Sequence, residues 1–247
     1  MNSLFIGKGL FETIRVEKGR CIFLKDHLLR LKKGADFFKW ELPLQTLHES
    51  IVQGARKTAH PLAYFKLYVW QEDAHLKFKL VTGKYEPDTK PWRLGLTAFV
   101  KNSDHPLLQF KTTSYLDNLF ILEEGKKKGF DELFFTNEKK EITEGTKTNI
   151  FWIKKKTLLT PQLACGCLPG IIREKVFKIA QKIGITLEET RAAAKELEKA
   201  DSVFMTNSLV QIKAVNEFQE IRYDINHPTV ILLKKELDKF KKDPKNY

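Results

Sequence analysis

Residues 164–175 read ACGCLPGIIREK, in which two cysteines lie one residue apart and a Pro-Gly runs into a helical pattern. Three interpretations compete: a metal site, a plain helix start and an anion site. The cysteines supply at most two thiolates, and no histidine lies near them in the sequence, which argues against a metal. After Pro169 and Gly170, the free N–H groups and positive dipole end of a new helix favour a phosphate. A Pro-Gly before a helix is usually only a turn, so this stretch alone leaves the choice open.

The composition bounds the protein class. The chain has 247 residues and 42% hydrophobic content, enough for one large domain or two modest ones with a buried core. Its net charge of +12 invites a nucleic-acid interpretation, but only eight of the 43 basic residues are Arg, the residue preferred for phosphate and base contacts. The lysines are also spread along the chain. We therefore expect a solvated, Lys-rich surface and no nucleic-acid partner.

The chain shows no sign of export or membrane insertion. The first residues, MNSLFIGKGLFETIR (1–15), lack a basic start, a long apolar run and a small-residue cleavage site. No apolar stretch approaches the ~20 residues that span a bilayer. The cysteines are too few for a disulfide framework. We expect a cytoplasmic protein with no membrane partner.

Alternation and periodicity predict a mixed α/β chain. A strand at 11–19 ends in a Lys-Gly turn, a second strand covers 20–24, and Asp26 is expected to be the N-cap of the next helix. The segment KYEPDTKPW (84–92) breaks the pattern and is the expected domain junction. Helices are further expected at 44–59, 113–129, 171–184 (closed by Gly184), 192–200 and 229–242. Strands are expected at 63–70, 76–83, 93–100, 131–137, 149–161 and 185–191, with two more around a polar turn within 202–218.

Several single residues are candidates for chemistry. Lys111 has apolar or neutral neighbours on both sides, and a desolvated lysine can act as a nucleophilic amine; the alternative is a surface lysine at a strand end. Glu144 lies between a turn and an apolar run, where a plain turn carboxylate is the alternative. Arg30 lies three residues after His27 on the same helix face, where a surface ion pair is the alternative. The polar turn TNS (206–208) offers either phosphate donors or a plain hairpin turn.

The order of these features is more specific than any one of them. In this order and approximate spacing, the sequence resembles the class IV (fold-type IV) pyridoxal-phosphate enzymes, which include branched-chain aminotransferases, D-amino-acid aminotransferases and aminodeoxychorismate lyases. The resemblance covers nearly the whole chain. It rests on FET (11–13), HLLRL (27–31), Lys111, E-x-x-x-x-N-I-F (144–151), LPGIIR (168–173) and TNS (206–208).

The resemblance implies a fold and a subunit arrangement. It implies a two-domain α/β (α+β) enzyme, with a small N-terminal α/β domain at 1–85, a linker at 86–91 and a larger C-terminal mixed α/β domain at 92–247 that binds pyridoxal phosphate. Family members usually act as homodimers on small amino substrates, and we expect the same here.

The resemblance also assigns the reacting end of the cofactor. Lys111 would form the Schiff base with pyridoxal 5'-phosphate and shuttle the proton at Cα. Glu144 would pair with the pyridine nitrogen and keep it protonated, which lets the ring act as an electron sink. Tyr115 matches the position whose hydroxyl meets the ring oxygen in several members.

The remaining assigned residues belong to the phosphate. Arg30 would supply the charged, bidentate contact. The backbone N–H groups of Ile171 and Ile172 would cradle the same phosphate, and Ser208, with Asn207 beside it, would complete the cup. A phosphate with nearly two negative charges needs both a cation and aligned amides, so the chemistry agrees with the resemblance.

Within the family, three features favour aminodeoxychorismate lyase: the early FET, the phosphate turn VFMTNSL (203–209) and the compact length. That enzyme converts 4-amino-4-deoxychorismate to 4-aminobenzoate and pyruvate for folate biosynthesis. Two features depart from the pattern. The strand that usually precedes the FET stretch is missing, and Trp70-Gln71 stand where many relatives carry an Arg-Gly that grips the substrate carboxylate. The alternatives are an aminotransferase for branched-chain or D-amino acids and, remotely, a non-catalytic binding protein on the same fold.

Overall fold

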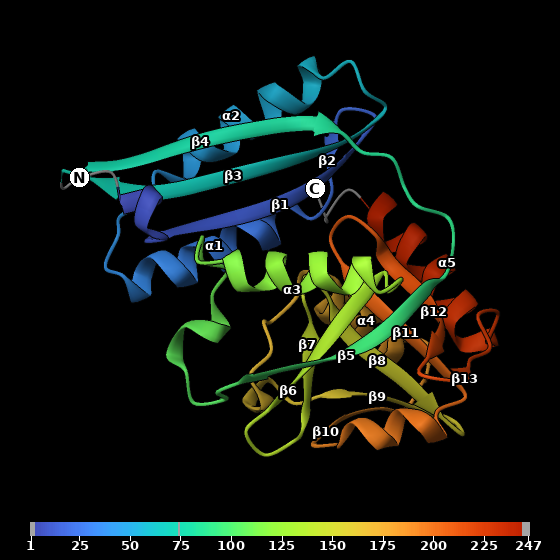
Figure 1. Ribbon diagram of the computed structural model, residues 1–247. Coiled ribbons are helices and arrows are strands. Elements are labelled where there is room, and N and C mark those ends of the chain that lie inside the picture. The colour runs from blue at the N-terminus through green and yellow to red at the C-terminus, as the bar shows by residue number, and fades with distance from the viewer. Residues whose placement is uncertain (1–2, 74, 244–247) are drawn as a thin grey trace. The chain divides into compact units, whose positions relative to one another are not determined.

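A computed structural model describes residues 3–73 and 75–243 of the chain (Figure 1). The chain packs into two units. The first comprises the described residues up to Asp88, Phe110–Tyr115 and those from Lys239 onward, and the second comprises Thr89–Gln109 and Leu116–Asp238. Both combine a sheet with helices, which confirms the predicted mixed α/β fold class. The short segment with Lys111 thus groups with the N-terminal residues although it follows them by more than twenty positions.

The first unit is an antiparallel sheet with two amphipathic helices. The sheet has the order β2–β1–β3–β4. Residue partners run from Gly9 opposite Trp70 to Glu17 opposite Leu62, which fixes the two faces of the sheet. Its elements are η1 (Ser3–Ile6), β1 (Gly9–Glu17), β2 (Arg20–Cys21), α1 (Leu24–Phe37), α2 (Leu44–Lys57), β3 (Leu62–Glu72) and β4 (His75–Lys84).

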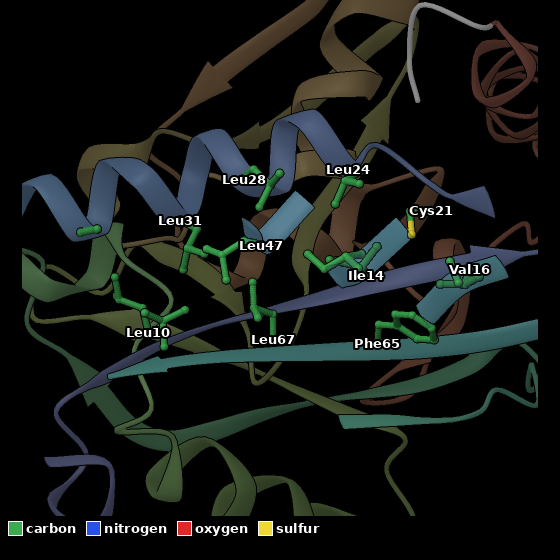
Figure 2. Close-up of a cluster of buried hydrophobic side chains, with 14 of the residues drawn as sticks. Leu10, Ile14, Val16, Cys21, Leu24, Leu28, Leu31, Leu47, Phe65 and Leu67 are labelled. Atoms are coloured by element: carbon green, nitrogen blue, oxygen red, sulfur yellow. The ribbon is translucent and has the colours of Figure 1, made fainter. Parts of the chain in front are cut away.

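Strand alternation and helix periodicity build one core in this unit (Figure 2). Every second residue of β1 points to the helices, so Leu10, Ile14 and Val16 are buried against the apolar stripes of α1 and α2. Phe65 and Leu67 of β3 complete the same layer. Because the period of a strand is two, the alternate residues of β1, among them Phe11, lie on the opposite face.

The second unit is built around a larger mixed sheet in the order β10–β9–β8–β11–β12–β5–β6–β7, with β13 beside β12. Its strands are β5 (Trp92–Lys101), β6 (Glu132–Asn137), β7 (Ile142–Gly145), β8 (Asn149–Lys154), β9 (Thr157–Pro161), β10 (Leu187–Thr190), β11 (Ser202–Asn207), β12 (Gln211–Phe218) and β13 (Ile221–Arg222). Its helices are η2 (Pro106–Gln109), α3 (Leu116–Lys127), η3 (Leu163–Cys165), α4 (Ile171–Lys182) and η4 (Ala194–Lys199), and α5 (Pro228–Lys242) begins here. Strand residues such as Phe134, Ile150, Val203 and Val215 are fully buried in its core.

Local expectations were wrong at four places. Asp26 is not the N-cap of α1, because the helix begins at Leu24 after Phe23 in a left-handed conformation; burial of Leu24 with Leu28 draws the start earlier. The strand at 20–24 shortens to Arg20–Cys21, and the helix at 113–129 begins only at Leu116. The segment at 192–200 forms a 3₁₀ helix over Ala194–Lys199, because so short a segment gains little from an α-helical nucleus.

One helix end matches its prediction. The last helical residue of α4 is Lys182, and Gly184 follows it with φ of 73°, a left-handed conformation that costs glycine nothing. The N–H of Ile185 then bonds back to the carbonyl of Ala180. Within residues 3–73 and 75–243, no helix is long and apolar enough to cross a membrane.

Candidate active site

Lys111 lies beside β1 in the first unit. Its carbonyl accepts a hydrogen bond of 2.9 Å from the N–H of Phe11, and Thr112 bridges to Leu10, so the segment extends the sheet at this edge. The Nζ of Lys111 lies 4.2 Å from the ring centroid of Phe11 and 5.0 Å from that of Tyr115. Two predicted site residues, Lys111 and Tyr115, are therefore brought together. The amine lies over aromatic faces, which attract its ammonium form.

Further aromatic side chains continue this surface. Phe11 stacks on Tyr68 with ring centroids 5.8 Å apart, and it meets Tyr115 edge to face at 5.4 Å. Burial raises the pKa of the Tyr68 hydroxyl, so the group stays protonated at neutral pH. Trp70 lies opposite Gly9 on the same face of the sheet and is 9% exposed. Lys111 thus has an aromatic neighbourhood made by β1, β3 and its own segment.

Arg30 belongs to a buried ionic cluster on the other face of β1. Its Nε and Nη2 donate to the two carboxylate oxygens of Glu12 at 2.8 and 2.6 Å. His27 Nδ1 lies 2.7 Å from Glu12 Oε2. Burial works to raise the pKa of Glu12, but the charge and hydrogen bonds of Arg30, with the hydrogen bond of His27, lower it to about 2. Desolvation lowers the pKa of His27, so the imidazole is neutral and its Nδ1 donates. The guanidinium is thereby fixed in one orientation.

Glu144 is the centre of a polar cluster in the second unit. Lys101, the last residue of β5, donates to its Oε1 at 2.6 Å. The N–H of Leu168 donates to its Oε2 at 2.9 Å, and Asn149 Nδ2 lies 3.4 Å from the same oxygen. The side chain of Glu144 is 11% exposed. The structure therefore joins Glu144 to the turn that precedes Ile171.

That turn leads into α4. Gly170 is its N-cap residue and supplies no side-chain hydrogen bond, so the first N–H groups of the helix, at Ile171 and Ile172, have no side-chain cap. The next residue, Arg173, is buried and its Nη2 donates to the carbonyl of Pro161 at 2.9 Å and to Glu189 at 2.5 Å. Arg173 ties the first turn of the helix to β9 and β10.

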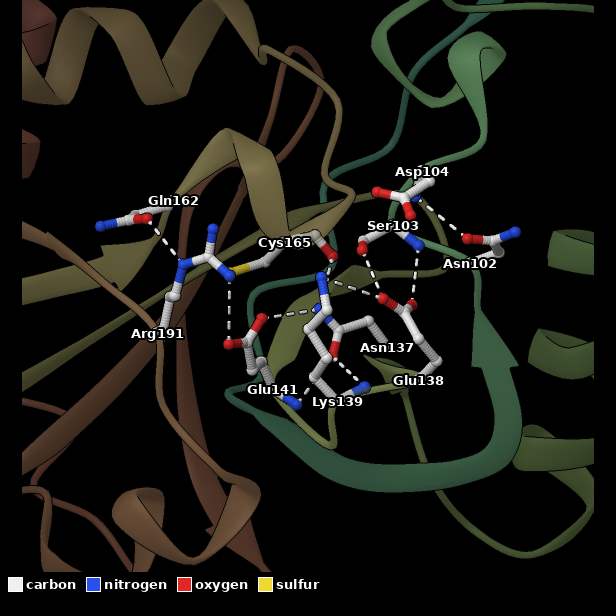
Figure 3. A network of polar contacts seen from close by, with 10 residues as sticks. All are labelled: Asn102, Ser103, Asp104, Asn137, Glu138, Lys139, Glu141, Gln162, Cys165 and Arg191. Carbon is white, nitrogen blue, oxygen red and sulfur yellow. Dashed lines mark hydrogen bonds and ion pairs between the residues drawn. The ribbon is translucent and has the colours of Figure 1, made fainter.

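The segment before the turn is held by a second polar network (Figure 3). Asn137 Nδ2 donates to the Cys165 carbonyl at 3.3 Å and to Glu141 at 2.8 Å. Arg191 links Glu141, at 3.4 Å, to the side chain of Gln162, at 3.1 Å. The network therefore joins the β6–β7 turn to Gln162 and to the backbone of Cys165.

Thr206 and Asn207 of the TNS motif are the last two residues of β11, and Ser208 begins the turn to β12. Asn207 Oδ1 accepts the N–H groups of Leu209 and Val210, each at 2.9 Å, and its Nδ2 donates to the carbonyl of Lys147 at 3.2 Å. Ser208 lies in the turn and is half-buried. The amide of Asn207 thus shapes the turn and joins it to the loop that follows Glu144.

The three cysteines are buried thiols outside this chemistry. Burial raises the pKa of Cys165 to about 11 and those of Cys21 and Cys167 to about 12, so little thiolate exists at neutral pH. Among residues 3–73 and 75–243, no group of three or more His, Cys, Asp and Glu side chains is arranged to hold a metal ion.

Sequence reasoning missed four residues of these clusters: Glu12, His27 as its partner, Lys101 and Asn149. An acidic residue at a core-facing position of a strand, as in FET, predicts a buried cation partner, and HLLR places His27 and Arg30 on one helix face to supply it. Asn149 was part of a motif but had no assigned role. Lys101 carried no signal, because it is one of many lysines at strand ends.

The donor set fits pyridoxal phosphate. The cofactor requires an amine for its aldehyde, a carboxylate for its ring nitrogen and donors for its phosphate. Lys111 would be the amine and Glu144 the carboxylate. The uncapped start of α4 after a glycine, with Arg30 and Ser208, would supply the phosphate donors.

Comparisons with known proteins agree with this chemistry. Residues 9–218 match the family described as amino-transferase class IV. A putative branched-chain-amino-acid aminotransferase of Methanocaldococcus jannaschii is 29% identical over 97% of this chain and 88% of its own length. The aminodeoxychorismate lyase of Bacillus subtilis is 25% identical over 88% of this chain and 80% of its own. The crystal structure of a putative 4-amino-4-deoxychorismate lyase from Legionella pneumophila has a TM-score of 0.91 and 28% identity, over 96% and 93% of the two chains.

Proposed function

Because the chain belongs to the class IV aminotransferases and is a pyridoxal-phosphate-dependent enzyme, we propose that it is an aminodeoxychorismate lyase. The reaction converts 4-amino-4-deoxychorismate to 4-aminobenzoate and pyruvate, a step toward folate. When bound, the cofactor supplies an aldehyde that condenses with amines and a ring that withdraws electrons from Cα. Loss of pyruvate leaves an aromatic ring, which supplies the driving force.

Lys111 is the proposed catalytic residue. Its amine would hold the cofactor covalently between turnovers and move the proton at the substrate Cα. Phe11 and Tyr115 surround the amine with ring faces, which limit its contact with water. Tyr115 would offer its hydroxyl to the ring oxygen of the cofactor.

The remaining residues would bind the cofactor. Glu144 would accept the ring N–H, oriented by its bonds to Lys101 and Leu168. Arg30, aimed by Glu12, would bind the phosphate together with the N–H groups of Ile171 and Ile172. Ser208 would complete the phosphate site, in a turn shaped by Asn207.

The aromatic surface beside Lys111 is the observation that carries the choice of lyase. Phe11 adjoins Lys111, Tyr68 stacks on Phe11, and Trp70 lies on the same face of the sheet. Aminodeoxychorismate presents a conjugated six-membered ring, and the faces of such a ring suit an aromatic surface.

An aminotransferase for branched-chain or D-amino acids is the second candidate. The faces of Phe11 and Tyr115 beside Lys111 are also suited to an aliphatic side chain, whose burial is favourable by about 25 cal/mol per Å². The same lysine serves both reactions, so these residues do not separate them.

The products decide between the two. We expect purified protein with bound pyridoxal phosphate to release 4-aminobenzoate and pyruvate from aminodeoxychorismate. In parallel, 2-oxo acids are offered with branched-chain and D-amino donors, and transamination without 4-aminobenzoate would sink the lyase assignment. Borohydride should fix the cofactor on wild-type protein and leave Lys111→Ala unlabelled. Labelling of that variant would show that another amine reacts.

A homodimer in the cytoplasm completes the proposal. In α3, Leu116, Leu119 and Phe120 are 76%, 50% and 51% exposed, an apolar surface typical of an interface. Three free, buried thiols support a reducing compartment. Light scattering should give twice the chain mass, Phe120→Asp should reduce it toward a monomer, and Lys126→Asp on the same helix should not.

A further inference from the structure

Asn149 lies between the two parts of the cofactor site that the second unit contributes. It is the first residue of β8 and is 6% exposed. Its Nδ2 donates to the carbonyl of Leu168 at 2.8 Å and lies 3.4 Å from Glu144 Oε2. The N–H of Leu168 donates to that same oxygen at 2.9 Å. Asn149 and Glu144 therefore hold both polar groups of Leu168.

The same side chain explains why residue 170 is glycine. Gly170 has φ of −72° and ψ of 141°, a conformation open to any residue, so backbone freedom does not require glycine. Space does. A Cβ built on Gly170 would overlap Asn149 Oδ1. The amide of Asn149 thus occupies the position of a side chain at the N-cap of α4.

We propose that Asn149 is a positioning residue that ties the carboxylate for the cofactor's ring nitrogen to the turn that receives its phosphate. The inference rests on the proposed binding of pyridoxal phosphate by Glu144 and the start of α4. Through Leu168 on one side and Gly170 on the other, Asn149 sets the spacing between these two binding groups. Spacing fixed before binding spares the cofactor the cost of ordering the turn.

The test compares two cofactor forms, pyridoxal phosphate and pyridoxal, which lacks the phosphate. The dissociation constants of both are measured by absorbance titration of cofactor-free protein. The ratio of the pyridoxal constant to the pyridoxal-phosphate constant reports what the phosphate contributes to binding. In Asn149→Ala we expect that ratio to fall about tenfold, as for loss of a buried hydrogen bond. A merely structural role would lower stability and leave the ratio unchanged.

Asn137→Ala is the matched control. Asn137 is also a buried asparagine of this unit, and its Nδ2 also donates to a carbonyl before the turn, that of Cys165. It contacts neither Glu144 nor Gly170 in any described hydrogen bond. We expect a comparable loss of thermal stability from this variant, with the ratio of the two dissociation constants unchanged.

Gly170→Ala supplies a second route that removes no polar group. In wild-type protein the new methyl displaces Asn149, and we expect the ratio to fall as in Asn149→Ala. In an Asn149→Ala background the space is vacant, so adding Gly170→Ala should change little. If Gly170→Ala lowered the ratio equally in both backgrounds, or if Asn149→Ala left the ratio unchanged, the inference about Asn149 would be wrong while the proposed function would stand. Absence of pyridoxal-phosphate binding by the wild-type chain would overturn the proposed function, and this inference with it.

Discussion

Two buried carboxylates, one in each unit, have pKa values that are shifted in opposite directions. Glu12 is 1% exposed and Glu132 is fully buried. Glu12 faces Arg30 and His27, and its pKa falls to about 2. Glu132 accepts hydrogen bonds from neutral donors, the N–H and hydroxyl of Thr146, the hydroxyl of Thr148 and the N–H of Leu133. Burial raises its pKa, although these bonds and the charge of Lys147 work to lower it. Desolvation prevails unless a cation lies against the carboxylate.

The difference reflects what each carboxylate holds. Glu12 orients a guanidinium proposed to bind a phosphate, so it has to remain charged beside it. Glu132 gathers residues 146–148, the loop that directly follows Glu144. Glu12 therefore orients the charged guanidinium of Arg30, whereas Glu132 fixes the conformation of the loop at 146–148.

Removal of the Glu12 carboxylate should lower the free energy of unfolding more than any of the other changes below. Glu12→Ala leaves Arg30 largely buried without this counter-ion, and loss of one partner of a buried pair costs about 3–5 kcal/mol. Urea unfolding measures the change in free energy. Lys32→Ala, which breaks the exposed pair with Asp36, should cost less than about 1 kcal/mol. Equal losses from both variants would show that burial of the Glu12 pair has no consequence.

The acid limb of the stability curve provides the second test. The folded pKa of Glu12, about 2, lies below its ordinary value of 4.5, so the charged pair stabilises the protein above pH 4.5 and this contribution is lost as the pH falls toward 2. The advantage of wild-type protein over Glu12→Gln should shrink by about 3 kcal/mol across that window. Unfolding at a series of pH values measures it, and a constant difference would refute the charged state assigned to Glu12.

Glu132→Gln should cost less and show the opposite pH dependence. The amide leaves one of the neutral donors without an acceptor, which costs about 1–3 kcal/mol. Because the folded pKa of Glu132 is raised, its contribution is complete below pH 4.5 and declines as the pH rises above that value. Wild-type protein should therefore lose its advantage over the variant toward neutral pH. A difference that instead grows with pH would show that the charge of Lys147 outweighs burial at Glu132.

His27→Asn should have the smallest effect and separate the two partners of Glu12. Asparagine keeps one donor near the position of Nδ1, and Arg30 retains both of its bonds, so we expect a loss of about 1 kcal/mol or less. Urea unfolding measures the loss. If the variant destabilised the protein as strongly as Glu12→Ala, the imidazole rather than the guanidinium would be the partner that matters.

The amino-acid sequence was sufficient for the mixed α/β class and for most of the elements, because alternation and helical periodicity are local patterns. It was also sufficient for the family, because the motifs around Arg30, Lys111, Glu144 and Gly170 follow one another in a fixed order. It failed at the start of α1 and at Ala194–Lys199, where burial and segment length outweighed local propensity.

Only the tertiary structure decided which residues support the candidate site. Glu12 and Arg30 are eighteen positions apart, Lys101 and Glu144 forty-three, and Asn149 and Leu168 nineteen. Nothing in the sequence distinguishes Lys101 from other lysines, or assigns Gly170 to space rather than to backbone freedom. Hydrogen bonds and ion pairs act over a few ångströms between atoms that the fold brings together, so their partners appear only once the strands and helices are packed.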